Sequence, residues 1–321
     1  MGFFDTLLWP FRQVVSWILW AFHELFSWLG MDPHSGWTWT ASIVFLVLVI
    51  RTALIPVFVK QIKAQRAMQA LQPDLRKLQA KYKGKRDQLS QQAMVAEQRE
   101  LFKKHKTNPL SSCLPILIQM PFFFALFTVL NNTANAKAAG EGIGALSPEH
   151  VRSFDDSSIF GARLSDTFLG TIGSGSPSVS VIIVALIMIV AMTASQFITQ
   201  KQIMSKNMTK EALEGPFMQQ QKMMLYILPL VFGIGGINFP IGVLIYWTAT
   251  NMWTLGQQFY VIRNNPTPGS QAEKELNERR AAKGLPPVGM KKAEASVEAA
   301  PTIVEPKTQR QQPQRKNRRK R

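Results

Sequence analysis

The chain has 321 residues, of which 46% are hydrophobic and 18% charged, and its formal net charge is +17. A single cysteine, Cys113, excludes a disulfide framework and a cysteine-ligated metal cluster. The sequence contains no phosphate-binding glycine loop, no GxSxG nucleophile motif and no HExxH-like pair of histidines. A soluble enzyme is therefore disfavoured, and no metal or cofactor is expected.

The first segment, residues 1–36, is amphipathic. Within Phe3–Leu29 hydrophobic residues recur every three or four positions, and polar groups fall mostly on the opposite face. This pattern is typical of a helix that lies in the membrane interface, which we expect on the extracytoplasmic side. Pro10 is expected to break or bend its start. A secretory signal peptide is the alternative, but it would carry basic residues where Asp5 stands.

Five later segments are apolar enough to cross a membrane. A spanning helix needs about 20 apolar residues, because about 30 Å of hydrocarbon is crossed at 1.5 Å per residue. The alternative, a buried helix of a soluble core, is disfavoured by five such runs in one chain. The sequence thus predicts an all-α polytopic membrane protein with five transmembrane helices. The predicted spans are residues 37–59, 109–130, 178–200, 223–238 and 240–262.

Lysine and arginine are concentrated in alternate connections between these spans. Residues 60–108 carry 13 of them, residues 201–222 carry 4 and residues 263–321 carry 15. The segment before the first span holds one, and the loop 131–177 holds three. Because positively charged connections remain in the cytoplasm, we expect an extracytoplasmic N-terminus and a cytoplasmic C-terminus in a bacterial plasma membrane.

The basic connection 60–108 has a thin hydrophobic stripe at helical spacing. Gly84 is placed to form a turn between two helices, and Pro73 is placed to restart the first of them. We expect a cytoplasmic helical hairpin with little core of its own. A solvated spacer and a docking element remain equally compatible with this pattern.

The tail, residues 263–321, is rich in proline, glutamine, alanine and charge, which predicts disorder. Its terminal basic block is expected to bind polyanions, either ribosomal RNA or anionic lipid headgroups. The alternative is an anchor that only holds the C-terminus in the cytoplasm. The block consists of Arg315, Lys316, Arg318, Arg319, Lys320 and Arg321.

Arg51 lies about 15 Å deep inside the first predicted span. A central arginine costs about 2.5–3.5 kcal/mol on insertion scales, and none of the other spans contains a carboxylate that could neutralise it. We therefore predict a water-filled intramembrane cavity around Arg51, with dipoles supplied by side chains such as Gln119, Gln196 and Tyr246. The alternative is an arginine that snorkels to the cytoplasmic headgroups.

Three motifs resemble the YidC/Oxa/Alb-type membrane protein insertases. They are Ile50–Pro56 followed by the basic hairpin, Asn108–Phe123, and Phe239–Trp247. The resemblance covers about Phe3–Arg263. The chain shows neither a large periplasmic domain nor a lipobox cysteine, and so is similar to actinobacterial members.

The resemblance implies a five-helix core with a hydrophilic groove open to cytoplasm and lipid. Arg51 matches the arginine that attracts the acidic N-terminal stretch of a substrate, and Gln196, Tyr246 and Trp247 lie where groove-lining residues are expected. The partners implied are nascent membrane proteins, with the ribosome, the Sec translocon and anionic lipids. No covalent chemistry is implied, and hence no catalytic residue.

Two other functions compete with insertion. An anion channel or transporter could use Arg51 as its binding site, although the spans show neither an internal repeat nor a second charge for a coupling ion. An RNA-tethering membrane anchor would explain the tail and leave Arg51 unexplained.

Overall fold

A computed structural model of the chain describes residues 3–85, 87–105, 108, 114–209, 212–213 and 217–288. Apart from one two-stranded hairpin, the secondary structure of these residues is helical, which confirms the predicted all-α class. The elements are α1 (Phe3–Trp28), α2 (Gly36–Ala53), α3 (Ile55–Ala70), α4 (Gln72–Tyr82), α5 (Gln88–Lys104), α6 (Leu114–Asn131), α7 (Thr133–Ala139), α8 (Pro148–Asp156), β1 (Ser158–Ile159), β2 (Ala162–Arg163), α9 (Phe168–Gly173), α10 (Val179–Asn207), α12 (Phe217–Gly236), α13 (Ile241–Asn264) and α14 (Gln271–Ala281).

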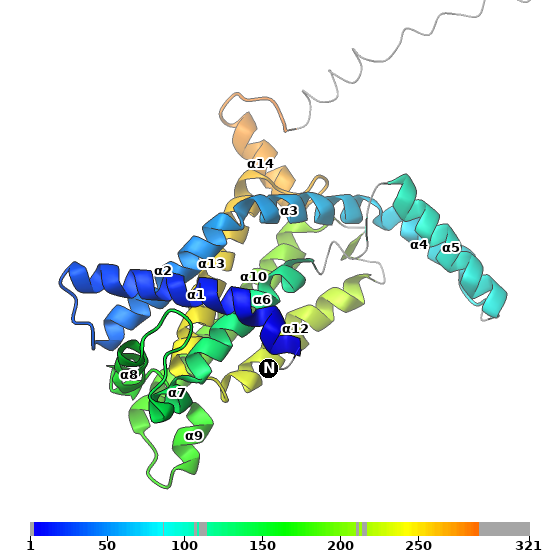
Figure 1. Ribbon diagram of the computed structural model, residues 1–321. Helices are drawn as coiled ribbons and strands as arrows, with labels where there is room; N and C mark the ends of the chain where they lie inside the picture. Colours follow the sequence, from blue (N-terminus) through cyan, green and yellow to red (C-terminus); the bar gives the residue numbers. More distant parts are fainter. Residues whose placement is uncertain are drawn as a thin grey trace, which may run out of the picture. The chain divides into compact units, whose positions relative to one another are not determined.

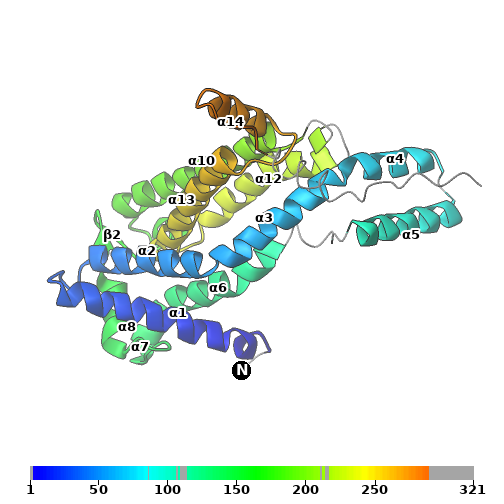
Figure 2. The same ribbon diagram turned by 90° about the horizontal axis from the view of Figure 1, so that it is seen from above.

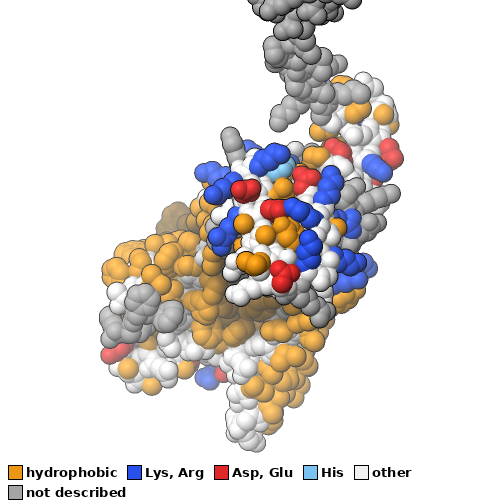
Figure 3. Space-filling model, turned by 90° about the vertical axis from the view of Figure 1, so that its right-hand side faces the viewer, with side chains coloured by type: hydrophobic (Ala, Val, Ile, Leu, Met, Phe, Trp, Pro, Cys, Tyr) orange, Lys and Arg blue, Asp and Glu red, His pale blue; other side chains and the backbone are white. Residues whose placement is uncertain are grey.

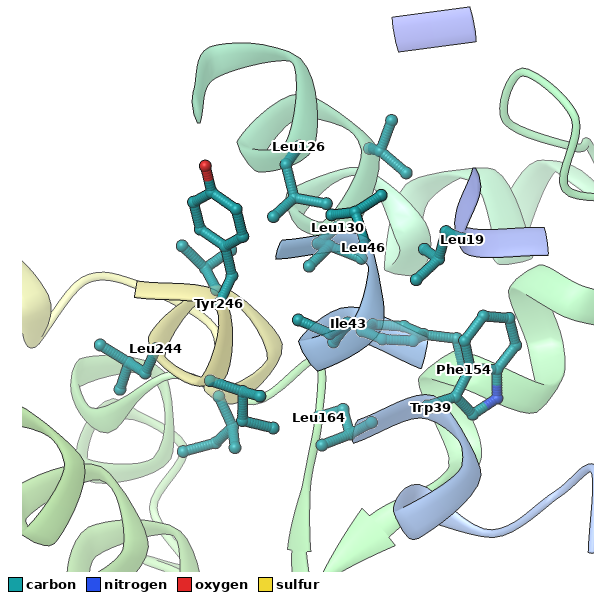
Figure 4. Close-up of a cluster of buried hydrophobic side chains, with 14 of the residues drawn as sticks. Leu19, Trp39, Ile43, Leu46, Leu126, Leu130, Phe154, Leu164, Leu244 and Tyr246 are labelled. Carbon is teal, nitrogen blue, oxygen red and sulfur yellow. The ribbon is translucent and has the colours of Figure 1, made fainter. Parts of the chain in front are cut away.

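The main hydrophobic core lies where α1, α2, α6, α10 and α13 meet. Figures 1 and 2 show α1 crossing α2 and α6, while α13 runs beside α10. Leu19, Trp39 and Phe154 are fully buried and converge from different elements in Figure 4. Helices that lie far apart in the sequence therefore share one hydrophobic core.

Pro10 was predicted to break or bend this segment; helix α1 continues through it, so the predicted break is wrong, and the bend stays a prediction. A proline inside a helix removes one backbone hydrogen bond, and the contacts of α1 with α2 and α6 compensate for that loss. Val15 and Leu19 face the core, whereas Trp9 and Trp17 are more than half exposed. This one-sided burial is the amphipathic pattern expected of an interfacial helix.

Residues 133–173, here called the cap, contain α7, α8, β1, β2 and α9 and cover one end of the core. Trp39 Nε1 donates to Ser153 Oγ at 3.0 Å, and Lys137 Nζ donates to Asp155 at 2.8 Å. The first amides of α13 have no side-chain cap. Instead Gly242 N donates to the Leu164 carbonyl at 2.9 Å. Residues 133–173 thus provide a hydrogen-bond acceptor for a backbone N–H in the first turn of α13.

The helix of the first predicted span ends at Ala53, earlier than the predicted Val59. Leu54 separates it from α3, and Figure 1 shows the chain changing direction there. Pro56 at the start of α3 has no N–H to continue the hydrogen-bond ladder of α2. Arg51 therefore lies in the last turn of α2, just before the bend.

Helices α4 and α5 form the predicted helical hairpin. Gly84 has a φ of +88° in the connection, a conformation that glycine adopts without strain. Glu97 on α5 accepts hydrogen bonds from Lys81 Nζ at 2.5 Å and Tyr82 Oη at 2.7 Å. No residue of α5 is buried, so few hydrophobic contacts hold the two helices together.

Among the described residues, α2 and α10 are each long and apolar enough to cross a membrane. The bent pair of α6 and α7, with a 44° change of direction, would provide a third span, and Gln221–Gly236 is a shorter apolar helix. Helix α13 has 24 residues but is interrupted by polar side chains. The five predicted spans and their boundaries therefore stay a prediction, because two of them are shorter or more polar than a simple span.

Large hydrophobic side chains remain exposed along α10 and α12, including Ile187 at 63% and Leu230 at 60%. Figure 3 shows charged side chains gathered on the part that faces the viewer, where the α4–α5 hairpin lies, and a broad hydrophobic surface behind and below it. Exposed apolar area on this scale is typical of a surface that contacts lipid.

The tail was predicted to be disordered from residue 263, which is wrong for residues 271–281, because they form α14. Ser270 Oγ accepts from Glu273 N at 3.3 Å, and Glu273 Oε2 accepts from Gly269 N at 2.7 Å. This reciprocal capping starts the helix in a highly charged sequence.

By internal contacts the chain divides into two units, Met1–Glu275 and Leu276–Arg321. The basic block at residues 315–321 lies outside the described residues.

Candidate functional site

A cavity of ≈ 480 Å³ lies between α2, α3, α6, α10, α12 and α13. Its wall combines one cation, a set of amide and hydroxyl side chains, and an aromatic side. Among the residues that the structure describes, no aspartate or glutamate lines the cavity. They are Arg51, Phe58, Gln61, Ile62, Gln65, Gln119, Met120, Phe123, Phe124, Gln196, Phe232, Tyr246, Trp247, Thr250, Asn251, Thr254, Gln257 and Gln258.

Arg51 supplies the positive charge of the cavity. It is 7% exposed, and its guanidinium carbon lies 5.4 Å from the centre of the Phe58 ring. Its Nε has no hydrogen-bond partner, and no ion pair links Arg51 to a described carboxylate. The bend after Ala53 brings α3, with Phe58, alongside the same cavity. The guanidinium is thus held inside the fold, beside the cavity.

The polar lining has unused hydrogen-bonding capacity. Gln119 Nε2 donates to Tyr246 Oη at 2.8 Å, which links α6 to α13. The remaining acceptor of Gln119, Oε1, has no partner, and neither do Gln196 Oε1 and Thr250 Oγ1. Buried polar atoms are normally hydrogen-bonded, so these atoms require water or an incoming polar chain. A cavity of this size can admit either one.

Trp247 belongs to the aromatic side of the cavity. Its ring centre lies 4.9 Å from that of Phe232 and 5.0 Å from that of Phe123, both in edge-to-face arrangements. These rings come from α12, α6 and α13 and form one continuous apolar wall. The cavity therefore offers polar hydrogen bonding on one side and apolar contact on the other.

The five groove residues predicted from the sequence all line this cavity, although they come from α2, α6, α10 and α13. Gln61 and Gln65 of α3 also line the cavity and were not predicted; they are spaced four residues apart and so share a face. Thr254 and Gln258, which continue a four-residue spacing from Thr250 along α13, were not predicted to line it either. The four-residue spacing of these polar side chains was the available signal.

Residues 30–268 match the sequence profile of the 60Kd inner membrane protein family. The chain belongs to this family. All of the cavity-lining residues fall inside the matched region, so the site is part of what the chain shares with the family.

Two relatives are named membrane protein insertase YidC. The protein from Streptomyces avermitilis is 51% identical over 76% of this chain and 56% of its own length. The protein from Tropheryma whipplei strain Twist is 41% identical over 87% of this chain and 90% of its own length. The chain thus spans little more than half of the first relative, and both relatives are actinobacterial, as the sequence indicated.

A solved structure entitled "Active YidC insertase crystal structure with the first transmembrane domain resolved" is 20% identical to the chain. It aligns with a TM-score of 0.43 over 81% of this chain and 47% of that one.

Proposed function

We propose that the chain is a membrane protein insertase that binds polar segments of nascent membrane proteins in its cavity and releases their apolar helices into lipid. The observation that carries this proposal is the buried Arg51 beside unpartnered amide and hydroxyl groups. The names of the relatives support the same reading. No bond has to be made or broken in this process.

The physical contribution of the cavity is to lower the desolvation cost of a polar segment. Moving an unpaired amide into hydrocarbon costs several kcal/mol, and the free acceptors of Gln119 and Gln196 offset part of that cost. Arg51 adds attraction for carboxylates where the dielectric is reduced. The aromatic wall around Trp247 provides the apolar surface that the following hydrophobic segment contacts.

The proposed orientation places the cap outside the cell and the α4–α5 hairpin in the cytoplasm. It follows from 32 lysines and arginines in residues 60–108, 201–222 and 263–321 against 4 in residues 1–36 and 131–177. The proposed partners are nascent membrane proteins, the ribosome, the Sec translocon and anionic lipids. The hairpin and the basic block at residues 315–321 are the segments proposed for ribosome or lipid contact.

The deciding experiment is reconstitution of the purified chain into liposomes with a single-span substrate that carries an acidic N-terminal tail. We expect protease protection of that tail above the level of empty liposomes. Protection no greater than in empty liposomes would refute an autonomous insertase. A steady chloride flux without any substrate protein would instead favour the anion-transport alternative, and the same vesicles allow both measurements.

A further inference from the structure

A second cluster of polar side chains joins α1 to the cap, well away from the cavity residues in sequence. His23, Glu24 and His150 each present one ligand atom, and these three atoms lie within 4.8 Å of one another. Glu24 Oε1 is 2.7 Å from His150 Nε2 and 3.9 Å from His23 Nδ1. Glu24 and His150 are 126 positions apart in the chain, so only the fold brings them together.

His23 is held with one ring nitrogen directed at this cluster. Its ring is 3% exposed and stacks on Trp39 with a centroid distance of 3.9 Å. Nε2 lies 3.0 Å from the Pro33 carbonyl, which only accepts, so Nε2 carries the proton. In the neutral ring Nδ1 then bears a lone pair, and it has no hydrogen-bond partner. A buried acceptor without a donor is costly, and a bound cation would satisfy it.

Hydrogen bonds orient His150 in a similar way. Ser147 Oγ, the N-terminal cap of α8, lies 2.6 Å from His150 Nδ1. With Nε2 donating to the Glu24 carboxylate, Nδ1 accepts from the Ser147 hydroxyl. If Nε2 bound a metal, its proton would shift to Nδ1 and the hydroxyl would become the acceptor. The serine therefore supports both tautomers, and metal-binding histidines commonly have such an orienting partner.

We propose that His23 Nδ1, Glu24 Oε1 and His150 Nε2 form a binding site for a divalent transition metal of the zinc class. Two imidazoles and one carboxylate suit zinc, and they leave a fourth position open for water. Glu24 is about half exposed and His150 is 17% exposed, so solvent can reach this position.

Metal at this site would cross-link α1 to the cap. Apart from the Glu24–His150 contact, Ala145 N donates to Ser16 Oγ at 2.9 Å between the same two parts. A cross-link would fix the amphipathic helix against the segment that covers the core. The metal site uses none of the cavity residues. Its test is therefore independent of the test of the proposed insertase function.

The test is zinc titration of the full chain, purified in detergent without a polyhistidine tag and stripped with EDTA. Isothermal titration calorimetry is expected to give one zinc per chain for the unmodified protein. Glu24→Gln and His150→Gln should each weaken binding at least about 10-fold. His34→Gln and His105→Gln, which alter the two histidines outside the cluster, are the matched controls and should bind as the unmodified protein does.

Thermal unfolding in the same detergent provides a second measurement. Zinc should raise the Tm of the unmodified chain and of both controls, because a ligand that binds the folded state stabilises it. It should not raise the Tm of Glu24→Gln, whose half-exposed side chain can be changed without unfolding the protein. Unmodified protein that binds no zinc, or Glu24→Gln and His150→Gln variants that bind it as tightly, would overturn the proposal.

Discussion

Replacement of Arg51 by alanine tests whether charge in the cavity attracts acidic segments. For a carboxylate about 6 Å from the guanidinium, Coulomb's law gives about 2.8 kcal/mol at an effective dielectric of about 20 and about 0.7 kcal/mol in bulk water. These energies correspond to about 100-fold and about 3-fold changes in rate. Because Arg51 is only 7% exposed, we expect a loss of about 10- to 100-fold for an acidic tail.

The assay compares two substrates that differ only by aspartate-to-asparagine changes in the translocated tail. Initial rates of protease protection are measured in liposomes with the unmodified chain and with Arg51→Ala, Arg51→Lys and Arg152→Ala. Arg152, an exposed arginine of the cap, is the matched control. The two-by-two comparison of arginine and tail charge isolates their coupling from other effects of each change. We expect Arg51→Lys to retain much of the acidic-tail rate.

Two results would contradict this reasoning. Equal losses for acidic and neutral tails would show that Arg51 acts without regard to substrate charge, and equal losses for the lysine and alanine variants would indicate guanidinium geometry instead. The Tm of each variant in detergent shows whether a loss of insertion activity is caused by unfolding. Since no described carboxylate pairs with Arg51, its removal should leave the Tm unchanged or raised.

Two further predictions concern the cap. Gly242→Ala would place a Cβ 2.8 Å from Phe154 Cζ, and such overpacking should destabilise by about 1–3 kcal/mol, which for a chain of this length lowers the Tm by about 2–5 °C. Gly235→Ala, with open space around its Cβ, should not lower the Tm, and equal effects of the two changes would contradict the packing argument. Burial is the largest single influence on the pKa of Asp155 and raises it, but the hydrogen bonds from Lys137 and Ser165, together with the positive charges of Lys137 and Arg163, outweigh it, and the pKa is lowered. The stability it contributes is present above the unfolded value near pH 4 and is lost as the pH falls through the lower folded value. Lys137→Met should therefore flatten the fall in Tm below about pH 4, and an unchanged profile would refute the role of this pair.

The helical class, the amphipathic first helix and the buried arginine could all be predicted from the sequence. Each depends on information local to a short segment, such as hydropathy, periodicity, or a charge within an apolar run. The sequence-derived hairpin turn at Gly84 also depends on a local requirement, a positive φ. Helix α14 had a local signal as well, the Ser270–Glu273 capping pair, but the composition of the tail obscured it.

Beyond the five groove residues grouped from the sequence and the family resemblance, only the tertiary structure decided which side chains share a site. The cavity draws its wall from six helices that lie far apart in the sequence. The hydrogen bond from Gln119 to Tyr246 spans 127 positions, and that from His150 to Glu24 spans 126. Hydropathy and periodicity carry no information about contacts at such separations, because these contacts form only when the helices pack against one another.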